Sequence, residues 1–336
     1  MNTAILGTGS YLPEQILTSA ELGRRLGVGE QWILDKTHVA ERRVAAPDEA
    51  TSDLATRAGE RALAEAGLDA TDINLLIVAT STPDQPIPAT ACAVQANLGA
   101  MRAAAFDVDS VCTGFVHALV TAHALLNLDA IAGTALVIGA DTYSRVLNYD
   151  DRRTCVLFGD GAGAVVLGKR ADGRGLLSST LGSDGRTADF VTIPGGGSRR
   201  PASRETLEAG AHYFAMRGRE VRELAAQVLP DLVVDLAKAA QLEVCDIDLI
   251  VPHQANGVML EELANTLALR PDQMHLTVER YGNTGAASVP ITLDDAVRAG
   301  RLADDDVLLM VAFGGGMSWG GTAWRWSGGR RAGRQW

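Results

Sequence analysis

The chain has 336 residues, of which 47% are hydrophobic and 5% aromatic, and it carries a formal net charge of −11. That length suits about two domains or one large, internally repeated domain, and the composition excludes a disordered or disulfide-stapled chain. The negative charge argues against nucleic acid or an anionic membrane as a partner, because phosphate binding needs a concentrated basic face. The basic cluster at residues 330–334 is interpreted as a solvated tail.

The N-terminus enters a predicted strand at residues 3–6 without a charged and then apolar leader. No apolar run reaches the ~20 residues of a membrane span, so we expect a cytoplasmic protein. The cysteines are widely spaced and form no C-x-x-C pair, so neither a zinc site nor a disulfide framework is expected. They are Cys92, Cys112, Cys155 and Cys245.

Short aliphatic segments alternate with amphipathic segments along most of the chain. The predicted strands are residues 75–80, 103–108, 135–139, 162–167, 249–251 and 307–312. The predicted helices are residues 52–66, 90–98, 114–128, 217–240 and 258–268. Alternation of this kind is typical of an α/β fold in which helices cover a mostly parallel sheet.

A pattern in the first half of the chain reappears in the second half. Residues 64–78 and 239–251 each contain a helix end, a loop with an Asp-Ile pair, and a buried strand. We infer two similar halves, 1–172 and 173–336, with a linker-like boundary at residues 170–175.

Cys112 lies where a predicted strand turns into a predicted helix, within the stretch 106–119. The first turn of a helix has unpaired N–H groups and a partial positive charge, which favour a thiolate. The thiolate is the nucleophilic form of cysteine, and the flanking small residues resemble a strained nucleophile elbow. The competing interpretation, which fits most cysteines, is a small buried apolar residue.

Three further stretches follow predicted strands or turns in the second half. His253 ends an apolar strand, where open α/β sheets place their ligands, and Asn283 follows a glycine in Gly-Asn-Thr-Gly. The triplet 314–316 follows the last predicted strand, and glycines let backbone N–H groups approach a ligand closely. The ordinary alternatives are a structural histidine, a left-handed asparagine turn and a flexible turn. The glycine-rich run 158–164 lacks the context of a nucleotide fingerprint and is interpreted as close backbone packing.

Cysteine, histidine and asparagine in this order, with a glycine triplet last, resemble the β-ketoacyl-ACP synthase III family of thiolase-fold condensing enzymes. The resemblance runs from residue 5 to about residue 326. Its motifs are Phe-Asp-Val…Cys-x-Gly-Phe, Pro-His-Gln-Ala-Asn, Gly-Asn-Thr…Ala-Ala-Ser-Val-Pro and Phe-Gly-Gly-Gly…Trp-Gly. The resemblance implies a homodimer with a thiolase-like, duplicated five-layer αβαβα fold. The cysteine would belong to the N-terminal half, and the histidine and asparagine to the C-terminal half.

The resemblance assigns catalytic roles to Cys112, His253 and Asn283. Cys112 takes the acyl group from an acyl-CoA, and the backbone N–H groups of Cys112 and Gly315 form the oxyanion hole. His253 and Asn283 then donate hydrogen bonds to the carbonyl of a malonyl thioester, which stabilises the enolate formed as CO2 leaves. The product is a 3-oxoacyl thioester. Neither a metal nor a cofactor is expected besides the CoA thioester substrates.

The resemblance carries over less completely to the contacts with CoA and the acyl chain. The implied CoA-binding residues are Trp32, Lys36, Arg152, Arg219 and Asn256. Trp32 and Arg152 match the pair on either face of adenine, and Lys36 replaces an arginine, which reduces a bidentate phosphate contact to a point charge. Phe313 matches the gate beside the cysteine. Ile87 stands where a partner subunit offers phenylalanine to the acyl pocket, so we expect chains longer or more branched than acetyl.

Three other functions stay open. A cysteine thioesterase shares the elbow and the histidine but needs a carboxylate to orient that histidine. A non-catalytic relative of the same fold is expected to lack the cysteine. An acyltransferase acting on an oxygen or nitrogen acceptor tends to replace the asparagine, which this chain retains.

The resemblance leaves the acceptor undecided between acyl carrier protein, CoA and a small molecule. Relatives that use the carrier protein have basic residues at positions that are occupied here by Glu223, Val258, Asn265 and Thr266. Glu261 and Glu262 add negative charge to the same predicted helix, and like charges oppose docking of an acidic partner. We therefore expect a CoA-bound or small-molecule acceptor as readily as a carrier-bound one. Such an acceptor points to polyketide or other specialised metabolism rather than to fatty-acid initiation.

Overall fold

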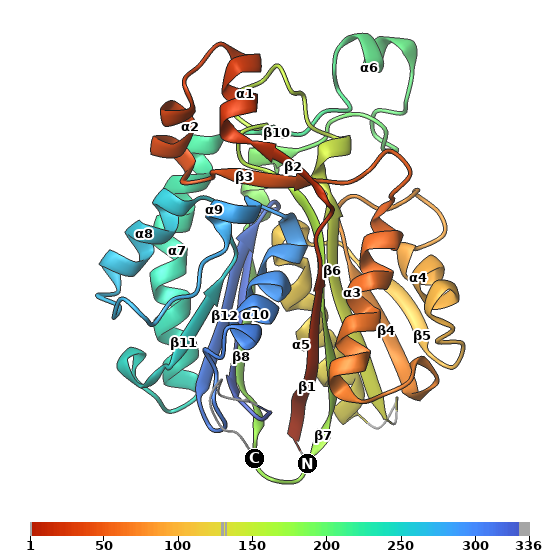
Figure 1. The fold of residues 1–336 in the computed structure, drawn as a ribbon, viewed down its shortest axis with the longest axis vertical. Coiled ribbons are helices and arrows are strands. Elements are labelled where there is room, and N and C mark those ends of the chain that lie inside the picture. Colours follow the sequence, from red (N-terminus) through yellow and green to blue (C-terminus); the bar gives the residue numbers. More distant parts are fainter. Residues whose placement is uncertain (1, 129–130, 132, 329–336) are drawn as a thin grey trace.

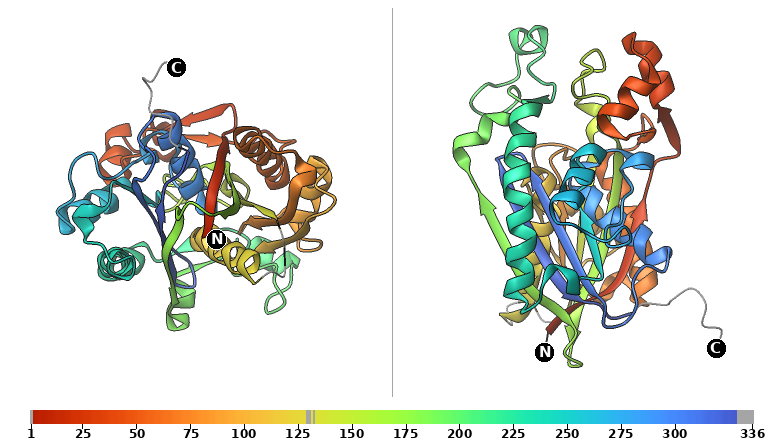
Figure 2. Two further views of the ribbon diagram at one scale, coloured as in Figure 1. Left: turned by 90° about the horizontal axis from the view of Figure 1, so that it is seen from below. Right: turned by 90° about the vertical axis from the view of Figure 1, so that its left-hand side faces the viewer.

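Figure 1 shows the computed structural model, which describes residues 2–128, 131 and 133–328. The basic cluster at residues 330–334 lies outside these residues. Two β-sheets occupy the centre, with helices between them and on both outer sides, as the end-on view in Figure 2 also shows. Within the described ranges, no helix is long and apolar enough to cross a membrane.

The first sheet has the strand order β1-β7-β6-β4-β5. Its strands are β1 (Asn2–Tyr11), β4 (Ile73–Ala79), β5 (Ala104–Val108), β6 (Thr134–Thr142) and β7 (Asp160–Arg170). β4 runs parallel to β5 and β6, and its nearly continuous apolar sequence fits a strand that is covered on both faces. β7 runs antiparallel to β1 and β6.

The second sheet has the order β11-β12-β13-β8. Its strands are β8 (Gly175–Ser183), β11 (Leu249–Pro252), β12 (Val307–Gly314) and β13 (Ser318–Arg325). β11 and β12 are parallel, whereas β13 is antiparallel to both β12 and β8. Only β7 in the first sheet and β13 in the second run against the other strands, so the prediction of mostly parallel sheets is confirmed apart from these two strands. β7 and β13 each return beside the preceding strand through a loop, without the crossover helix that a parallel connection needs.

The two sheets repeat the same design, with one strand missing from the second. β8, β13, β12 and β11 take the places of β1, β7, β6 and β4. In place of β5 the second sheet has a single bridge between Ile250 and Met274. The repeated Asp-Ile loops also match, since Asp72 accepts from the Asp69 amide at 3.0 Å and Asp246 from the Glu243 amide at 2.9 Å.

The helices form three layers, which makes five layers with the two sheets. The middle layer is α5 (Gly114–Asn127) and α10 (Ser288–Arg298), and the outer layers are α3 (Thr51–Ala66) with α4 (Thr90–Leu98), and α7 (Gly218–Ala239) with α8 (Gly257–Thr266). The αβαβα prediction is confirmed. α5 is apolar around most of its circumference because it lies between both sheets. Side chains of both halves share this middle core, so the division at residue 172 stays a prediction.

Smaller elements lie at the upper end of the sheets in Figure 1. They are β2 (Gln15–Thr18), β3 (Glu41–Val44), α1 (Ser19–Leu26), α2 (Glu30–Thr37), β9 (Val191–Thr192), β10 (Ala215–Met216), α6 (Arg204–Glu208) and α9 (Val278–Tyr281). The buried Arg42 of β3 connects this strand to β2 and to the loop before β7. Its guanidinium donates to the carbonyl of Leu17 at 3.1 Å and to that of Val156 at 2.9 Å.

The glycine-rich run 158–164 is confirmed as close backbone packing. It enters β7, and a Cβ atom at Gly163 would lie 2.6 Å from the Ile291 nitrogen of α10. These glycines let α10 lie directly on the first sheet.

Candidate active site

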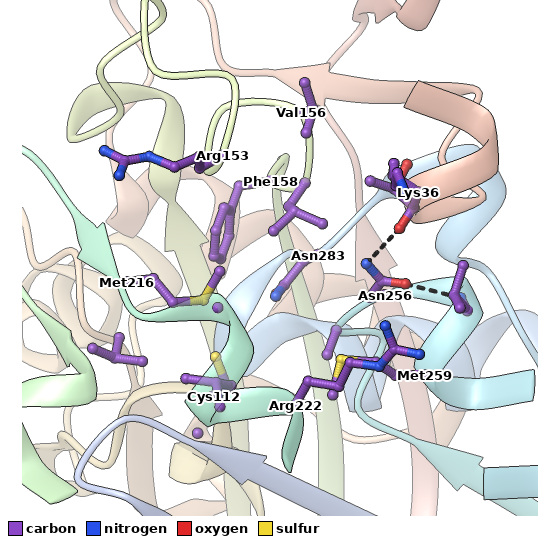
Figure 3. Close-up of a pocket in the computed structure, with 18 of the residues that line it drawn as sticks. Lys36, Cys112, Arg153, Val156, Phe158, Met216, Arg222, Asn256, Met259 and Asn283 are labelled. Carbon is purple, nitrogen blue, oxygen red and sulfur yellow. Dashed lines mark hydrogen bonds between the residues drawn. The ribbon is translucent and has the colours of Figure 1, made fainter. Parts of the chain in front are cut away.

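A single cavity of about 410 Å³ connects the surface with Cys112. Cys112, His253 and Asn283 all line it, although they come from different parts of the chain. Figure 3 shows Cys112, Phe158 and Asn283 around a common space. The exposed Lys36 lines the same cavity, which therefore reaches solvent.

Further predicted site residues line this cavity. They are Trp32, Arg152, Arg219, Asn256, Phe313 and Gly315. Ile87 does not line the cavity in the single chain. It is 85% exposed on the surface. Among the described residues, no group of three or more potential ligands could hold a metal ion.

Cys112 occupies a one-turn 3-10 helix (Val111–Thr113) between β5 and α5, as the sequence predicts. The residue before it, Val111, has φ +46°, which is unfavourable for a β-branched residue. The strained backbone position of the elbow is therefore Val111. Two hydroxyl groups fasten this turn to the glycine loop. Ser318 Oγ lies 2.7 Å from Thr113 Oγ1 and donates to the Gly315 carbonyl at 3.0 Å.

The structure adds an influence that opposes the thiolate favoured by the helix N-terminus. Burial, together with the nearby Asp141 carboxylate, raises the pKa of Cys112 to about 12. Loss of hydration outweighs the partial charge of the α5 N-terminus, because the sulfur is enclosed by protein while the helix charge acts only over the first turn. The resting nucleophile is therefore a neutral thiol.

His253 follows β11, and its backbone nitrogen donates to the Val311 carbonyl at 2.7 Å. Its Nδ1 lies 2.6 Å from Ser288 Oγ, at the start of α10. Ser288 also accepts from the Gln254 amide at 3.3 Å, so its own hydrogen is free to reach Nδ1 and leave Nε2 as the donor. Burial lowers the pKa of His253 to about 3, which keeps the ring neutral.

Asn283 is held by the backbone of the loop before β7. Its backbone nitrogen donates to the Leu157 carbonyl at 2.8 Å, and its backbone carbonyl accepts from the Gly159 nitrogen at 3.0 Å. The left-handed residue of this turn is Gly282, with φ +63°, rather than Asn283. The Asn283 side-chain oxygen accepts from Gly285 at 2.9 Å, which leaves the side-chain nitrogen to donate into the cavity.

The predicted CoA-binding residues at the rim contact one another. The Arg152 guanidinium lies 5.3 Å from the centre of the Trp32 ring. Asn256 begins α8, where its side chain accepts from Val258 at 2.9 Å and donates to the Lys36 carbonyl at 3.0 Å (Figure 3). Its two polar atoms thus join α8 to α2, and its contact with CoA stays a prediction.

The sequence interpretation missed several residues around the nucleophile. Phe158 stacks on Tyr143 with ring centres 4.6 Å apart, and Phe214 meets Phe158 edge-on at 4.8 Å. Phe158 and Phe214 line the cavity beside Cys112, whereas Tyr143 is buried behind them. These aromatic residues are far apart in the sequence and follow no period, so spacing gave no indication of them. Ser288 stood within a recognised motif but had no assigned role.

Family models match two parts of the chain. Residues 106–185 match 3-oxoacyl-[acyl-carrier-protein] synthase III, and residues 237–326 match its C-terminal model. The β-ketoacyl-[acyl-carrier-protein] synthase III of Caldanaerobacter subterraneus subsp. tengcongensis is 46% identical over 96% of this chain and 97% of its own length. Acetoacetyl CoA synthase NphT7 of Streptomyces sp. is 51% identical over 94% of this chain and 95% of its own length.

Solved structures agree with these relatives. The 3-oxoacyl-(acyl carrier protein) synthase III, FabH, from Pseudomonas aeruginosa superimposes with a TM-score of 0.90 at 37% identity, covering 98% of this chain and 100% of that one. The priming β-ketosynthase of the R1128 polyketide pathway gives a TM-score of 0.89 at 30% identity, covering 98% and 97%.

Proposed function

We propose the chemistry of this chain in detail from the premise that it belongs to the 3-oxoacyl-[acyl-carrier-protein] synthase III family and is therefore an acyl-transferring condensing enzyme. We propose that Cys112, His253 and Asn283 carry out a decarboxylative Claisen condensation and that the malonyl group is presented on CoA. The observation that supports CoA as the carrier of the malonyl group is that the two arginines of α7 that line the cavity are each paired with a carboxylate.

In the first half-reaction Cys112 attacks the carbonyl of an acyl-CoA. A carbon–sulfur bond forms to Cys112, the bond to CoA breaks, and the thiol proton leaves with the CoA thiol. The backbone N–H groups of Cys112 and Gly315 would hold the oxyanion, and Ser318 fixes the Gly315 loop against the Cys112 turn. Since the resting thiol is neutral, this step involves no net change in charge.

In the second half-reaction the malonyl thioester loses CO2, and its enolate carbon attacks the acyl group on Cys112. The neutral His253 Nε2–H and the Asn283 side-chain amide donate to the thioester oxygen as it gains charge. Cys112 leaves as a thiolate and takes up one proton. The group at His253 Nδ1 is the Ser288 hydroxyl, whereas a cysteine thioesterase of the hydrolase type needs a carboxylate at that place.

The charge around the rim supports malonyl-CoA over a carrier protein. Arg219 Nε lies 2.8 Å from Glu223 of the same helix, and Arg222 pairs with Glu262 of α8. An acidic carrier protein would therefore meet arginines that already have partners, together with the exposed Glu261. The relative named acetoacetyl CoA synthase is consistent with a CoA-bound product.

Kinetics with malonyl-CoA and malonyl-carrier protein at low and moderate salt test this assignment. We expect kcat/KM to favour malonyl-CoA. The double variant Glu223→Lys, Glu262→Lys should raise the rate with the carrier protein selectively, by about 10-fold at low salt. Glu60→Lys, on the outer helix α3, is the matched control and should change neither rate. A strong, salt-sensitive preference of the unmodified enzyme for the carrier protein would contradict the proposal.

The edge of the first sheet supports a homodimer. β5 is the last strand of that sheet, and Ile87 and Met101, which precede it, are 85% and 71% exposed. We propose that two copies pair along β5, which would bring Ile87 of one copy towards the cavity of the other. Light scattering during size-exclusion chromatography measures this directly, and a monomer at micromolar concentration would contradict it.

A further inference from the structure

A buried glutamine stands between the two residues that donate to the enolate. Gln254 directly follows His253 in the Pro-His-Gln-Ala-Asn motif, and it has no role in the two half-reactions described above. It is 1% exposed and does not line the cavity. Its side chain therefore does not reach the substrate, and its role has to follow from its contacts within the protein.

The side-chain amide of Gln254 makes three hydrogen bonds to the backbone. Its Nε2 donates to the Pro252 carbonyl at 2.8 Å, at the end of β11. Its Oε1 accepts from the backbone nitrogens of Thr277 at 2.8 Å and Val278 at 3.0 Å. The side chain thus joins the end of the strand that precedes His253 to the start of α9.

The start of α9 depends on this contact. The first N–H groups of a helix have no partners inside the helix. Thr277, which precedes α9, makes no capping hydrogen bond with its side chain. Its hydroxyl instead lies 2.6 Å from Thr292 Oγ1 of α10. Gln254 Oε1 therefore takes the place of the missing cap.

α9 leads directly into the loop that carries Asn283. Its single turn closes with a hydrogen bond from the Gly282 nitrogen to the Val278 carbonyl at 2.9 Å, and Asn283 is the next residue. Gly282 has φ +63°, and a Cβ atom there would lie 2.6 Å from the Leu157 carbonyl oxygen, so the turn fits closely against the loop before β7. A shift of Val278 is therefore passed to Asn283 over one turn of helix.

The backbone of Gln254 supports the other donor. Its nitrogen donates to Ser288 Oγ at 3.3 Å, and the same hydroxyl lies 2.6 Å from His253 Nδ1. One residue is thus bonded to the support of His253 through its backbone and to the support of Asn283 through its side chain.

We propose that Gln254 is a positioning residue for Asn283, which sets the place of the Asn283 amide relative to His253 so that both donate to one thioester oxygen. Such donors have to be held within about 0.5 Å of the productive geometry. An amide suits this place because it donates to one carbonyl and accepts from two N–H groups without adding charge near the enolate. The inference rests on the proposed function, since it concerns the release of CO2.

The test compares two steps in full-length Gln254→Met, whose side chain is similar in length but cannot make the three hydrogen bonds. We expect CO2 release from malonyl-CoA to slow by about 10-fold, because a misplacement of about 1 Å costs ~10²-fold and the Thr277–Thr292 contact still holds part of the turn. Acylation of Cys112 should stay normal. The loss should appear in kcat with KM for malonyl-CoA unchanged, as for an interaction made in the transition state.

A double-mutant cycle with Asn283→Ala shows whether Gln254 acts through Asn283. The effects of residues that act as a unit do not add, whereas a general loss of packing adds to the loss of Asn283. In a chain that already carries Asn283→Ala, Gln254→Met should slow CO2 release by no more than about 2-fold. A further loss of about 10-fold in the double variant would overturn the inference.

Gln273→Met is the matched control. Gln273 is 2% exposed, and its side chain also makes three hydrogen bonds to the backbone, with Val244, Ile247 and Arg270 near the opposite end of β11. We expect both steps to keep their normal rates in folded Gln273→Met. If CO2 release slowed there as much as in Gln254→Met, the effect would belong to any buried glutamine and the inference would be wrong.

Gln254→Asn is the second variant, for use if Gln254→Met does not fold. Its amide is one methylene group shorter and cannot span from Pro252 to α9, so CO2 release should slow in the same way. Normal CO2 release from the folded variant would overturn the inference alone, provided that Asn283→Ala is slow. Absence of acyl-Cys112 in the unmodified protein with acetyl-CoA would overturn the proposed function itself.

Discussion

Replacing Gly314 by alanine tests how closely the glycine triplet fits the nucleophile. A Cβ atom at Gly314 would lie 2.8 Å from the Cys112 nitrogen and 2.9 Å from the Cys112 Cβ. Ordinary contact begins at 3.4 Å, so the Cys112 turn or the end of β12 has to move by roughly half an ångström. A misplacement of about 1 Å costs ~10²-fold in rate, and we therefore expect acylation of Cys112 to slow by about 10-fold. Overpacking of this kind also costs about 1–3 kcal/mol of stability.

The assay is single-turnover acylation with acetyl-CoA, quenched and read on the Cys112 peptide. Gly59→Ala is the matched control, since its Cβ would lie 3.2 Å from the Leu136 side chain in the outer core between α3 and the first sheet. We expect Gly59→Ala to leave the acylation rate of the folded protein unchanged. A folded Gly314→Ala variant that acylates at the normal rate would refute the close fit.

The remaining predictions concern the second half-reaction and the acyl pocket. His253→Ala and Asn283→Ala should still form acyl-Cys112 but release CO2 about 10²-fold more slowly for each lost donor; normal CO2 release would disprove their role. Ser288→Ala removes the hydrogen-bond partner of His253 Nδ1 and should slow CO2 release by about 10-fold while acylation stays normal. Because burial lowers the pKa of His253 to about 3, CO2 release should show no histidine titration between about pH 5 and pH 8, and an inflection near 6.5 would contradict this. The same change should weaken folding as the pH falls from about 6.5 towards 3, since only the unfolded chain then binds the proton. Ile87→Phe should lower the ratio of kcat/KM for hexanoyl-CoA over acetyl-CoA, and an unchanged ratio would rule out Ile87 as a pocket residue.

The location of the reacting groups was predictable because it follows from strand order. Cys112, His253 and the glycine triplet each stand at or shortly after the carboxyl end of a strand, and the carboxyl ends of neighbouring strands meet at one edge of a sheet. The repeat at residues 64–78 and 239–251 likewise placed β4 and β11 correctly, since a helix end, a capped loop and a buried strand form a local unit.

The state of the nucleophile was not predictable from the same patterns. The pKa of Cys112 depends on burial and on Asp141, which lies outside the local stretch and beneath it in the fold. Ser288 contacts His253 from an element far away in the sequence, and a single side-chain contact of that kind leaves no period. The direction of β7 and β13 was missed because alternating strands and helices indicate parallel neighbours even where two strands join through a loop.

The missing strand of the second sheet limits how copies of this chain can assemble. An exposed sheet edge is a template for adding another chain, and a duplicated fold with two complete sheets would offer such an edge at both ends. Here β5 is available at one end, whereas the single Ile250–Met274 bridge stands at the other. The inner edges face each other, as Asn2 of β1 donates to the Leu176 carbonyl of β8 at 2.8 Å. The proposed pairing along β5 would therefore stop at two copies, which would protect a chain with this much sheet against open-ended fibres.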